Sequence, residues 1–368
     1  MGGRRSARGR AGVRQRAAAM AAAAALAVGL AAGVAGSPPA QAAGGQARTG
    51  RPVPGRVDTG RTGPRPAGGG QASTSRAGTS PAGGGRTGTG RTGTTQAGLS
   101  PAATRRAAAS QPPATVTAPE ARRAICASAA HPKLASRLAR NITSAVHGRH
   151  SAVGLTVADP RLDLACRLDR ASHFYAASVI KVTIISALLR KIGGRPHMTK
   201  KQRSLAWAMI TRSSNSAATA LWDEVGLRHL QRFLRLAGMT HTRLDWGAWG
   251  LSGITAQDEL TLLKLLTSPG KVLSTASRRY VLYLMAHVVA AERWGVPAGA
   301  PATVTVHVKN GWLPFPGADW RINSIGAFNG PGTAYQIVVL TAGNRSMSYG
   351  IATIQAAARV INRDIREA

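Results

Sequence analysis

A chain of 368 residues with a net charge of +34 is long enough for one large domain or two ordinary ones. The charge is unevenly distributed, because Asp58 is the only acidic residue before Glu120. This asymmetry excludes one uniform domain, and it predicts that the N-terminal third differs in kind from the remainder.

The first residues have the pattern of an export signal. An arginine cluster in residues 4–16 precedes an apolar run over residues 17–35. The small-residue pattern at residues 40–42 predicts cleavage before Ala43, so we interpret residues 1–42 as a signal peptide and the protein as secreted. A transmembrane anchor is the alternative, which the short Ala-rich run disfavours. The sequence leaves both the general and the twin-arginine export route open.

Residues 43–118 are of low complexity, and Gly, Arg, Thr, Pro, Ser, Ala and Gln dominate them. Apolar side chains are too sparse to offset the entropy of ordering the chain, which predicts a disordered linker with a reach of ~50 Å. Its arginines suit an anionic cell-wall polymer, and a plain solvated stalk is the alternative. No nucleic-acid-binding motif accompanies them, so no specific nucleic-acid partner is predicted.

The chain has two cysteines, Cys126 and Cys166. In the oxidising compartment expected for an exported protein they predict one disulfide, and two buried free thiols are the alternative. We expect Cys126 at the front of the first folded helix and Cys166 on an early strand. No His/Cys cluster at ligand spacing accompanies them, so a metal site is not predicted.

The folded part is predicted to span residues 119–368. Apolar periodicity predicts a helix over residues 133–148, followed by a hairpin that turns at Asp159 and Pro160. From Ser178 to about residue 289 the pattern is helical, with glycine breaks at Gly226, Gly238 and Gly270. Three late strands over residues 302–312, 321–330 and 334–343 and a closing helix follow.

These elements predict an α/β (α+β) architecture. The two early and three late strands are expected to share one antiparallel sheet, with terminal helices covering a face of it. The helical block then forms a second lobe, and a site is expected at the junction of the two lobes.

Three short motifs fall at that junction. In SVIK, Ser178 and Lys181 are three residues apart on a helix, so the hydroxyl and the amine can meet, and a lysine in apolar surroundings can act as the base for a serine nucleophile. A capping serine followed by a solvent-seeking lysine is the structural alternative. In SSN, Ser213 and Asn215 can face a pocket or simply cap a helix. Lys309, in KNG, ends a strand or begins a turn.

In this order, SVIK, SSN and KNG resemble the motif set of the class A β-lactamase and penicillin-recognising serine enzyme family. The surrounding sequences FYAASVIKV and MITRSSNSAATAL are similar to the family as well. The resemblance spans roughly residues 120–368. It implies a β-lactamase/transpeptidase-like fold in which an antiparallel sheet with flanking terminal helices packs beside an all-helical lobe.

The resemblance also implies roles for the matching residues. Ser178 would be the acylated nucleophile, Lys181 its base, and Ser213 would pass a proton to the leaving nitrogen. Backbone N–H groups would form the oxyanion hole. Ser178 and Trp312 would supply these N–H groups. Lys309 would attract a substrate carboxylate, and Asn215 would bind a substrate amide. Asn310 and Gly311 would shape the edge strand that contacts the substrate.

Three departures from the family pattern stand out. Ser214 replaces the Asp and Asn310 replaces the Thr of the motifs quoted above. The stretch from Thr242 to Asp245 resembles the start of the family's omega loop, yet the glutamate that activates the deacylating water does not follow. The next residues are Trp-Gly-Ala-Trp instead. Asp258 and Glu259 come later and fit an ordinary first helical turn.

The sequence therefore predicts a secreted, monomeric serine hydrolase that forms an acyl-enzyme on Ser178 with a β-lactam or related amide, without a cofactor or metal. A penicillin-binding D,D-peptidase-like enzyme with slow deacylation is the first alternative. A cell-wall binding protein without turnover is the second. The missing glutamate favours both alternatives, whereas the serine and lysine motifs favour the two enzymes.

Overall fold

The computed structural model describes residues 123–315 and 319–368. The signal peptide and linker predicted for residues 1–118 lie outside the described residues. The described residues form a six-stranded antiparallel sheet in the order β1-β3-β2-β8-β7-β6. Its strands are β1 (Ile125–Ala127), β2 (Ala152–Asp159), β3 (Leu164–Leu168), β6 (Thr305–Phe315), β7 (Asp319–Gly330) and β8 (Thr333–Asn344).

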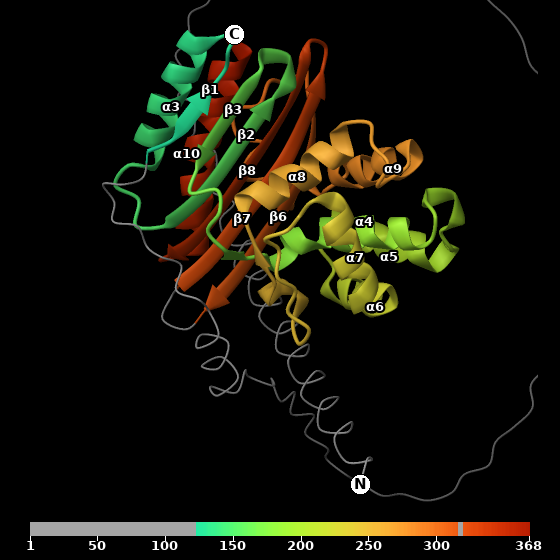
Figure 1. Cartoon of the computed structure of the whole chain (residues 1–368). Coiled ribbons are helices and arrows are strands. Elements are labelled where there is room, and N and C mark those ends of the chain that lie inside the picture. The colour runs from blue at the N-terminus through green and yellow to red at the C-terminus, as the bar shows by residue number, and fades with distance from the viewer. Residues whose placement is uncertain (1–122, 316–318) are drawn as a thin grey trace, which may run out of the picture. The chain divides into compact units, whose positions relative to one another are not determined.

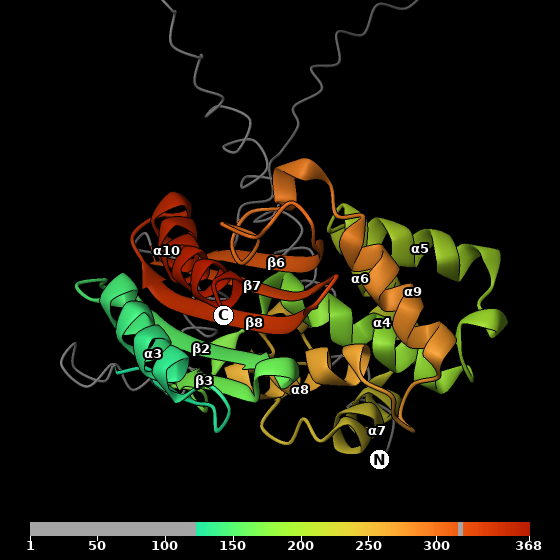
Figure 2. The same cartoon turned by 90° about the horizontal axis from the view of Figure 1, so that it is seen from above.

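The two terminal helices cover one face of the sheet, as Figures 1 and 2 show. They are α3 (Pro132–Val146) and α10 (Met347–Arg366). Helix α3 buries Leu134, Leu138 and Ile142, spaced one turn apart, so its apolar stripe faces the core. The expected single sheet with flanking terminal helices is confirmed.

The segment between the early and late strands forms the helical lobe (Figure 1). Its helices are α4 (Ile180–Lys191), α5 (Lys200–Thr211), α6 (Asn215–Val225), α7 (Leu227–Ala237), α8 (Ala256–Thr267) and α9 (Thr275–Ala286). Helix α4 is buried from Ile180 to Leu189, so it is the central helix of the lobe. Gly226 and Gly238 end α6 and α7, as the sequence predicts. No helix within the described ranges is long and apolar enough to cross a membrane.

Strand β6 forms one edge of the sheet, since it pairs only with β7. It continues three residues beyond the predicted end, and Pro314 still lies opposite Trp320 of β7. A proline is tolerated there because an edge strand has one side without a ladder partner. The extension lengthens the strand that carries Lys309.

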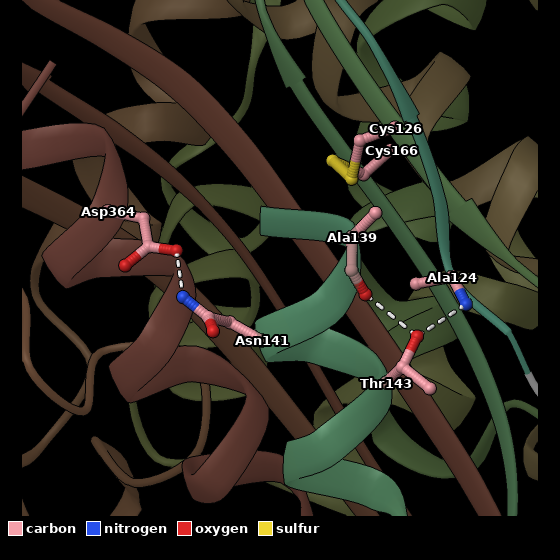
Figure 3. The surroundings of a disulfide bond; sticks show 7 residues. All are labelled: Ala124, Cys126, Ala139, Asn141, Thr143, Cys166 and Asp364. Atoms are coloured by element: carbon pink, nitrogen blue, oxygen red, sulfur yellow. Dashed lines mark hydrogen bonds between the residues drawn. A yellow bond between two sulfur atoms is a disulfide. The ribbon is translucent and has the colours of Figure 1, made fainter. Parts of the chain in front are cut away.

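A disulfide joins Cys126 to Cys166. The expected position of Cys126 was wrong: the residue lies on β1, opposite Cys166 of β3, and α3 begins only at Pro132. A strand of three residues is too short to show alternation, and it forms because β3 offers it a pairing edge. Figure 3 shows α3 beside this strand, where the Thr143 hydroxyl accepts a hydrogen bond from the Ala124 N–H at 3.0 Å.

Replacing both cysteines by serine is expected to lower the free energy of unfolding by about 3 kcal/mol, because a cross-link across 40 residues reduces the entropy of the unfolded chain. The urea midpoint of the double variant, compared with that of the oxidised protein, measures this. Equal midpoints would show that β1 contributes nothing to the cooperative unit.

Candidate active site

Ser178 lies where the sheet and the helical lobe meet. It belongs to a single turn, η3 (Ala177–Val179), that leads directly into α4. The preceding residue, Ala177, has a φ of 48° although it is not a glycine, a conformation that costs energy and persists only where the surroundings impose it. The sharp turn at the start of α4 is therefore imposed by tertiary contacts.

Two contacts hold the chain ahead of Ser178. The short strand β4 (Phe174–Tyr175) pairs with β5 (Gly253–Ile254). From the sheet, the fully buried amide of Asn323 donates to the carbonyl of Tyr175 at 2.8 Å and to that of Ala176 at 3.3 Å. Its carbonyl oxygen accepts from the Thr341 N–H, which fixes the amide itself. The sequence analysis missed Asn323, because nothing in its own strand indicates a partner 147 residues away.

Gly311 brings β6 against the Ser178 turn. A Cβ atom added at this glycine would lie 2.8 Å from the Ser178 nitrogen and 2.9 Å from the Ala176 carbonyl oxygen. Any side chain would push the two backbones apart. The glycine of KNG therefore allows the close approach that an oxyanion hole made from the N–H groups of Ser178 and Trp312 requires.

Lys181 is completely buried on α4 and points at the SSN turn. Its ammonium donates to the Ser213 carbonyl at 2.6 Å, to the Asn215 Oδ1 at 2.8 Å and to the Ser213 hydroxyl at 3.2 Å. Ser214 caps α6 by accepting from the Ala217 N–H. The middle serine of SSN thus caps the helix, and its two neighbours contact the lysine.

Lys309 reaches the same hydroxyl from β6. Its ammonium is fully buried and donates to the Ser213 hydroxyl at 2.9 Å and to the Asn310 carbonyl at 2.9 Å. Ser213 itself has a φ of 51°, the second strained residue of the site. The Ser213 oxygen therefore lies between two lysines that both donate to it, which leaves its own hydrogen free for a third group.

Burial lowers the pKa of both ammonium groups. Burial lowers the pKa of Lys181 well below its ordinary value, and the charge of Lys309 lowers it further. Burial also lowers the pKa of Lys309 to about 8, against the opposing effect of the Glu292 carboxylate. Lys181 is thus easier to deprotonate than an ordinary lysine, which is what a general base requires.

The loop after Asp245 places an indole over Lys181. Asp245 accepts from the backbone N–H groups of Gly247 and Ala248 at 2.9 and 2.8 Å, which closes a tight turn. Trp249 follows, with its ring centre 5.0 Å from the Lys181 nitrogen and its indole N–H donating to Thr219 of α6. The loop thus covers the lysine with an aromatic ring.

The Asn310 side chain holds the loop after α9 against β6. Its fully buried amide donates to the carbonyls of Glu292 and Trp294 at 2.7 and 2.8 Å. The loop after α9 folds over this part of β6. Glu292, which sequence analysis also missed, lies there with its carboxylate 3.7 Å from the Lys309 nitrogen. The described part of the chain holds no cluster of three or more His, Cys, Asp or Glu side chains that suits a metal ion.

Comparisons with known proteins bear on the fold. A model of the β-lactamase enzyme family matches residues 194–365, and no curated protein sequence matches the chain. The structure is similar to a class A β-lactamase from Bacteroides cellulosilyticus DSM 14838, with a TM-score of 0.55 and 17% identity over 63% of this chain and 98% of that one. A class A β-lactamase from Mycobacterium abscessus aligns with a TM-score of 0.54 and 20% identity over 62% and 99%.

A third similar structure is that of PBP-A, with a TM-score of 0.54 and 19% identity over 63% of this chain and 97% of that one. The described residues therefore have the fold of the class A β-lactamases. The family model begins after α4, so SVIK lies outside the matched range. The positions of Ser178 and Lys181 therefore rest on the geometry described above.

The two acids expected in the first turn of α8 are buried in this class A-like fold. Asp258 accepts from the His241 N–H at 2.9 Å and from the Thr242 hydroxyl at 2.8 Å, so it anchors the chain that follows α7. Glu259 is fully buried, and neither of its oxygens has a hydrogen-bond partner among the described residues. Burial, together with the charge of Asp258, raises the pKa of Glu259 to about 8.

Glu259 makes stability fall as pH rises. Its carboxyl ionises near 4.5 in the unfolded chain and near 8 in the folded one, so between these values only the unfolded state releases the proton. Between pH 5 and pH 8, the free energy of unfolding of Glu259→Gln is expected to fall by less than that of the unmodified protein. The difference is on the order of 3 kcal/mol, because the ionisable carboxyl is gone. Urea unfolding at pH 5 and pH 8 measures it. Glu367→Gln, at an exposed residue, should keep the wild-type slope, and an unchanged slope in Glu259→Gln would contradict the assignment.

Proposed function

We propose that this protein is a serine hydrolase that forms an acyl-enzyme through Ser178 with a β-lactam or related amide, and that it releases the acyl group slowly. The observation that carries the proposal is the Ser213 hydroxyl, which accepts from Lys181 at 3.2 Å and from Lys309 at 2.9 Å. A hydroxyl that accepts twice directs its own hydrogen elsewhere, and a leaving nitrogen is the group that needs it.

In the proposed acylation, protons pass between Ser178, Lys181, Ser213 and the leaving nitrogen. The Ser178 oxygen attacks the carbonyl carbon while its proton passes to the neutral amine of Lys181. The backbone N–H groups of Ser178 and Trp312 stabilise the oxyanion. When the carbon–nitrogen bond breaks, Ser213 donates its proton to the leaving nitrogen and recovers one from Lys181. The result is an ester on Ser178 and a free amine.

Deacylation needs an activated water molecule that attacks the acyl ester, and fewer contacts in the site support this step. The Trp249 ring covers the side of Lys181 where a carboxylate that activates this water would be expected. The ring centre lies 5.0 Å from the lysine nitrogen. This observation favours a penicillin-binding, D,D-peptidase-like role as the second candidate. One structural neighbour is a mutant of PBP-A described as an acyl-enzyme complex with penicillin G.

The N-terminal segment supports a location for this activity. Its arginine cluster, apolar run and small-residue cleavage pattern support export, and the arginines of the linker support attachment to an anionic cell-wall polymer. We include secretion and a small-molecule or peptidoglycan-type substrate in the proposal.

Incubation with penicillin G is expected to give a one-to-one adduct that intact-mass measurement detects for many minutes. Ser178→Ala should abolish it, because the nucleophilic oxygen is gone, whereas Ser216→Ala, at an exposed serine of α6, should not. Rapid colour from a chromogenic cephalosporin without a lasting adduct would show an efficient lactamase instead. Neither adduct nor colour would leave the binding-protein alternative.

Lys181→Arg is expected to reduce the acylation rate at pH 7 by at least about a hundredfold, because a guanidinium keeps its proton and cannot act as a base. In the unmodified protein the rate should rise with pH through the pKa of Lys181, well below the ordinary lysine value, since the base works only when deprotonated. Lys191→Arg, at the exposed end of the same helix, is the matched control. A rate that survives Lys181→Arg would assign the base elsewhere.

A further inference from the structure

Lys309 has partners in three directions before any substrate arrives. Its ammonium has three hydrogens, and it donates to the Ser213 hydroxyl and to the Asn310 carbonyl, each at 2.9 Å. The third partner is the Glu292 carboxylate, whose oxygen lies 3.7 Å from the nitrogen. The charge that would attract a substrate carboxylate is thus already paired within the protein.

Glu292 is positioned by the fold. Its backbone N–H donates to the Val289 carbonyl, and its own carbonyl accepts from the buried Asn310 amide at 2.7 Å. The neighbouring Arg293 turns away from the site and donates to the carbonyls of Ala286 and Val306. The loop after α9 therefore brings a carboxylate to Lys309 and directs its arginine elsewhere.

The packing around the pair keeps its charges effective. The side chain of Lys309 is fully buried, and that of Glu292 is only 14% exposed. The Trp294 and Trp312 rings, 6.0 Å apart, pack beside the same loop. Charges that water screens poorly act strongly on a third charge placed between them.

We propose that Glu292 serves as a resident counterion for Lys309, so that the site selects acyl donors without a carboxylate on the leaving-group side, namely esters and neutral amides. The inference rests on the proposed acyl-enzyme function and names its substrate class. An incoming carboxylate gains attraction from Lys309 and loses most of it to repulsion from Glu292. A neutral group avoids that repulsion and leaves the ion pair intact.

Penicillin G and its methyl ester test this choice, because they share the lactam and differ in the carboxylate. The readout is the ratio of their acylation rates by intact mass at pH 6, two units below the pKa of Lys309, where its ammonium is charged. The unmodified protein should react with the ester at least as fast as with the acid. Glu292→Gln should shift the ratio toward the acid by about tenfold or more, because the repulsion is removed.

Two controls accompany the variant. Glu367→Gln changes the net charge equally at an exposed C-terminal residue and should keep the original ratio. Glu292→Asp keeps the charge and should stay close to the unmodified protein, which separates charge from folding defects. A faster reaction with the acid in the unmodified protein, or an equal ratio in Glu292→Gln, would overturn the inference.

A measurement that needs no acylation separates this inference from the proposed function. Benzoate and benzamide are titrated separately while the indole N–H resonance of Trp312 is followed by NMR. Glu292→Gln should bind benzoate more tightly relative to benzamide than the unmodified protein does. That result without any lactam adduct would overturn the acyl-enzyme proposal and keep the charge selection. Absence of both adduct and fragment binding would overturn both.

Discussion

The structure around the site depends on one hydroxyl shared by two buried ammonium groups. Lys181 comes from the central helix of the helical lobe and Lys309 from the edge strand of the sheet, and both donate to Ser213. Two ammonium groups that share one acceptor repel each other. The hydrogen bonds to this acceptor and to the surrounding carbonyl groups offset the cost of burying both charges. Burial lowers the pKa of Lys181, and the charge of Lys309 lowers it further, which is the property that a base needs. The contact that joins the two lobes therefore also affects the protonation of Lys181.

Backbone geometry supports this contact from both sides. Ala177 and Ser213 both adopt left-handed conformations that are uncommon for residues with a side chain, and both lie beside the reacting groups. Gly311 lets β6 approach Ser178 more closely than any other residue would permit. Asn323 bonds the carbonyls just ahead of the turn. The contacts with the sheet thus hold the strained turn in its conformation.

Two loops approach the buried lysines of the site. On the lobe side, the Trp249 indole covers Lys181. On the sheet side, the loop held by Asn310 carries Glu292 to Lys309. Under the proposed function, the first contact bears on how an acyl group would leave and the second on which acyl donor would enter. Both contacts come from loops, which can vary without disturbing the buried lysines.

The sequence by itself determined the elements and the motif residues, because helical periodicity, strand alternation and glycine punctuation are local properties. The early hairpin, the late strands and the three motifs could all be located in this way. The tertiary structure alone decided that Cys126 lies on a strand, that Asn310 anchors a loop, and that Glu259 is buried. It also decided the neighbours of Lys309, since Glu292 reaches it only through the path of the loop after α9. These contacts depend on packing between segments far apart in the chain, and no local pattern encodes such a distance.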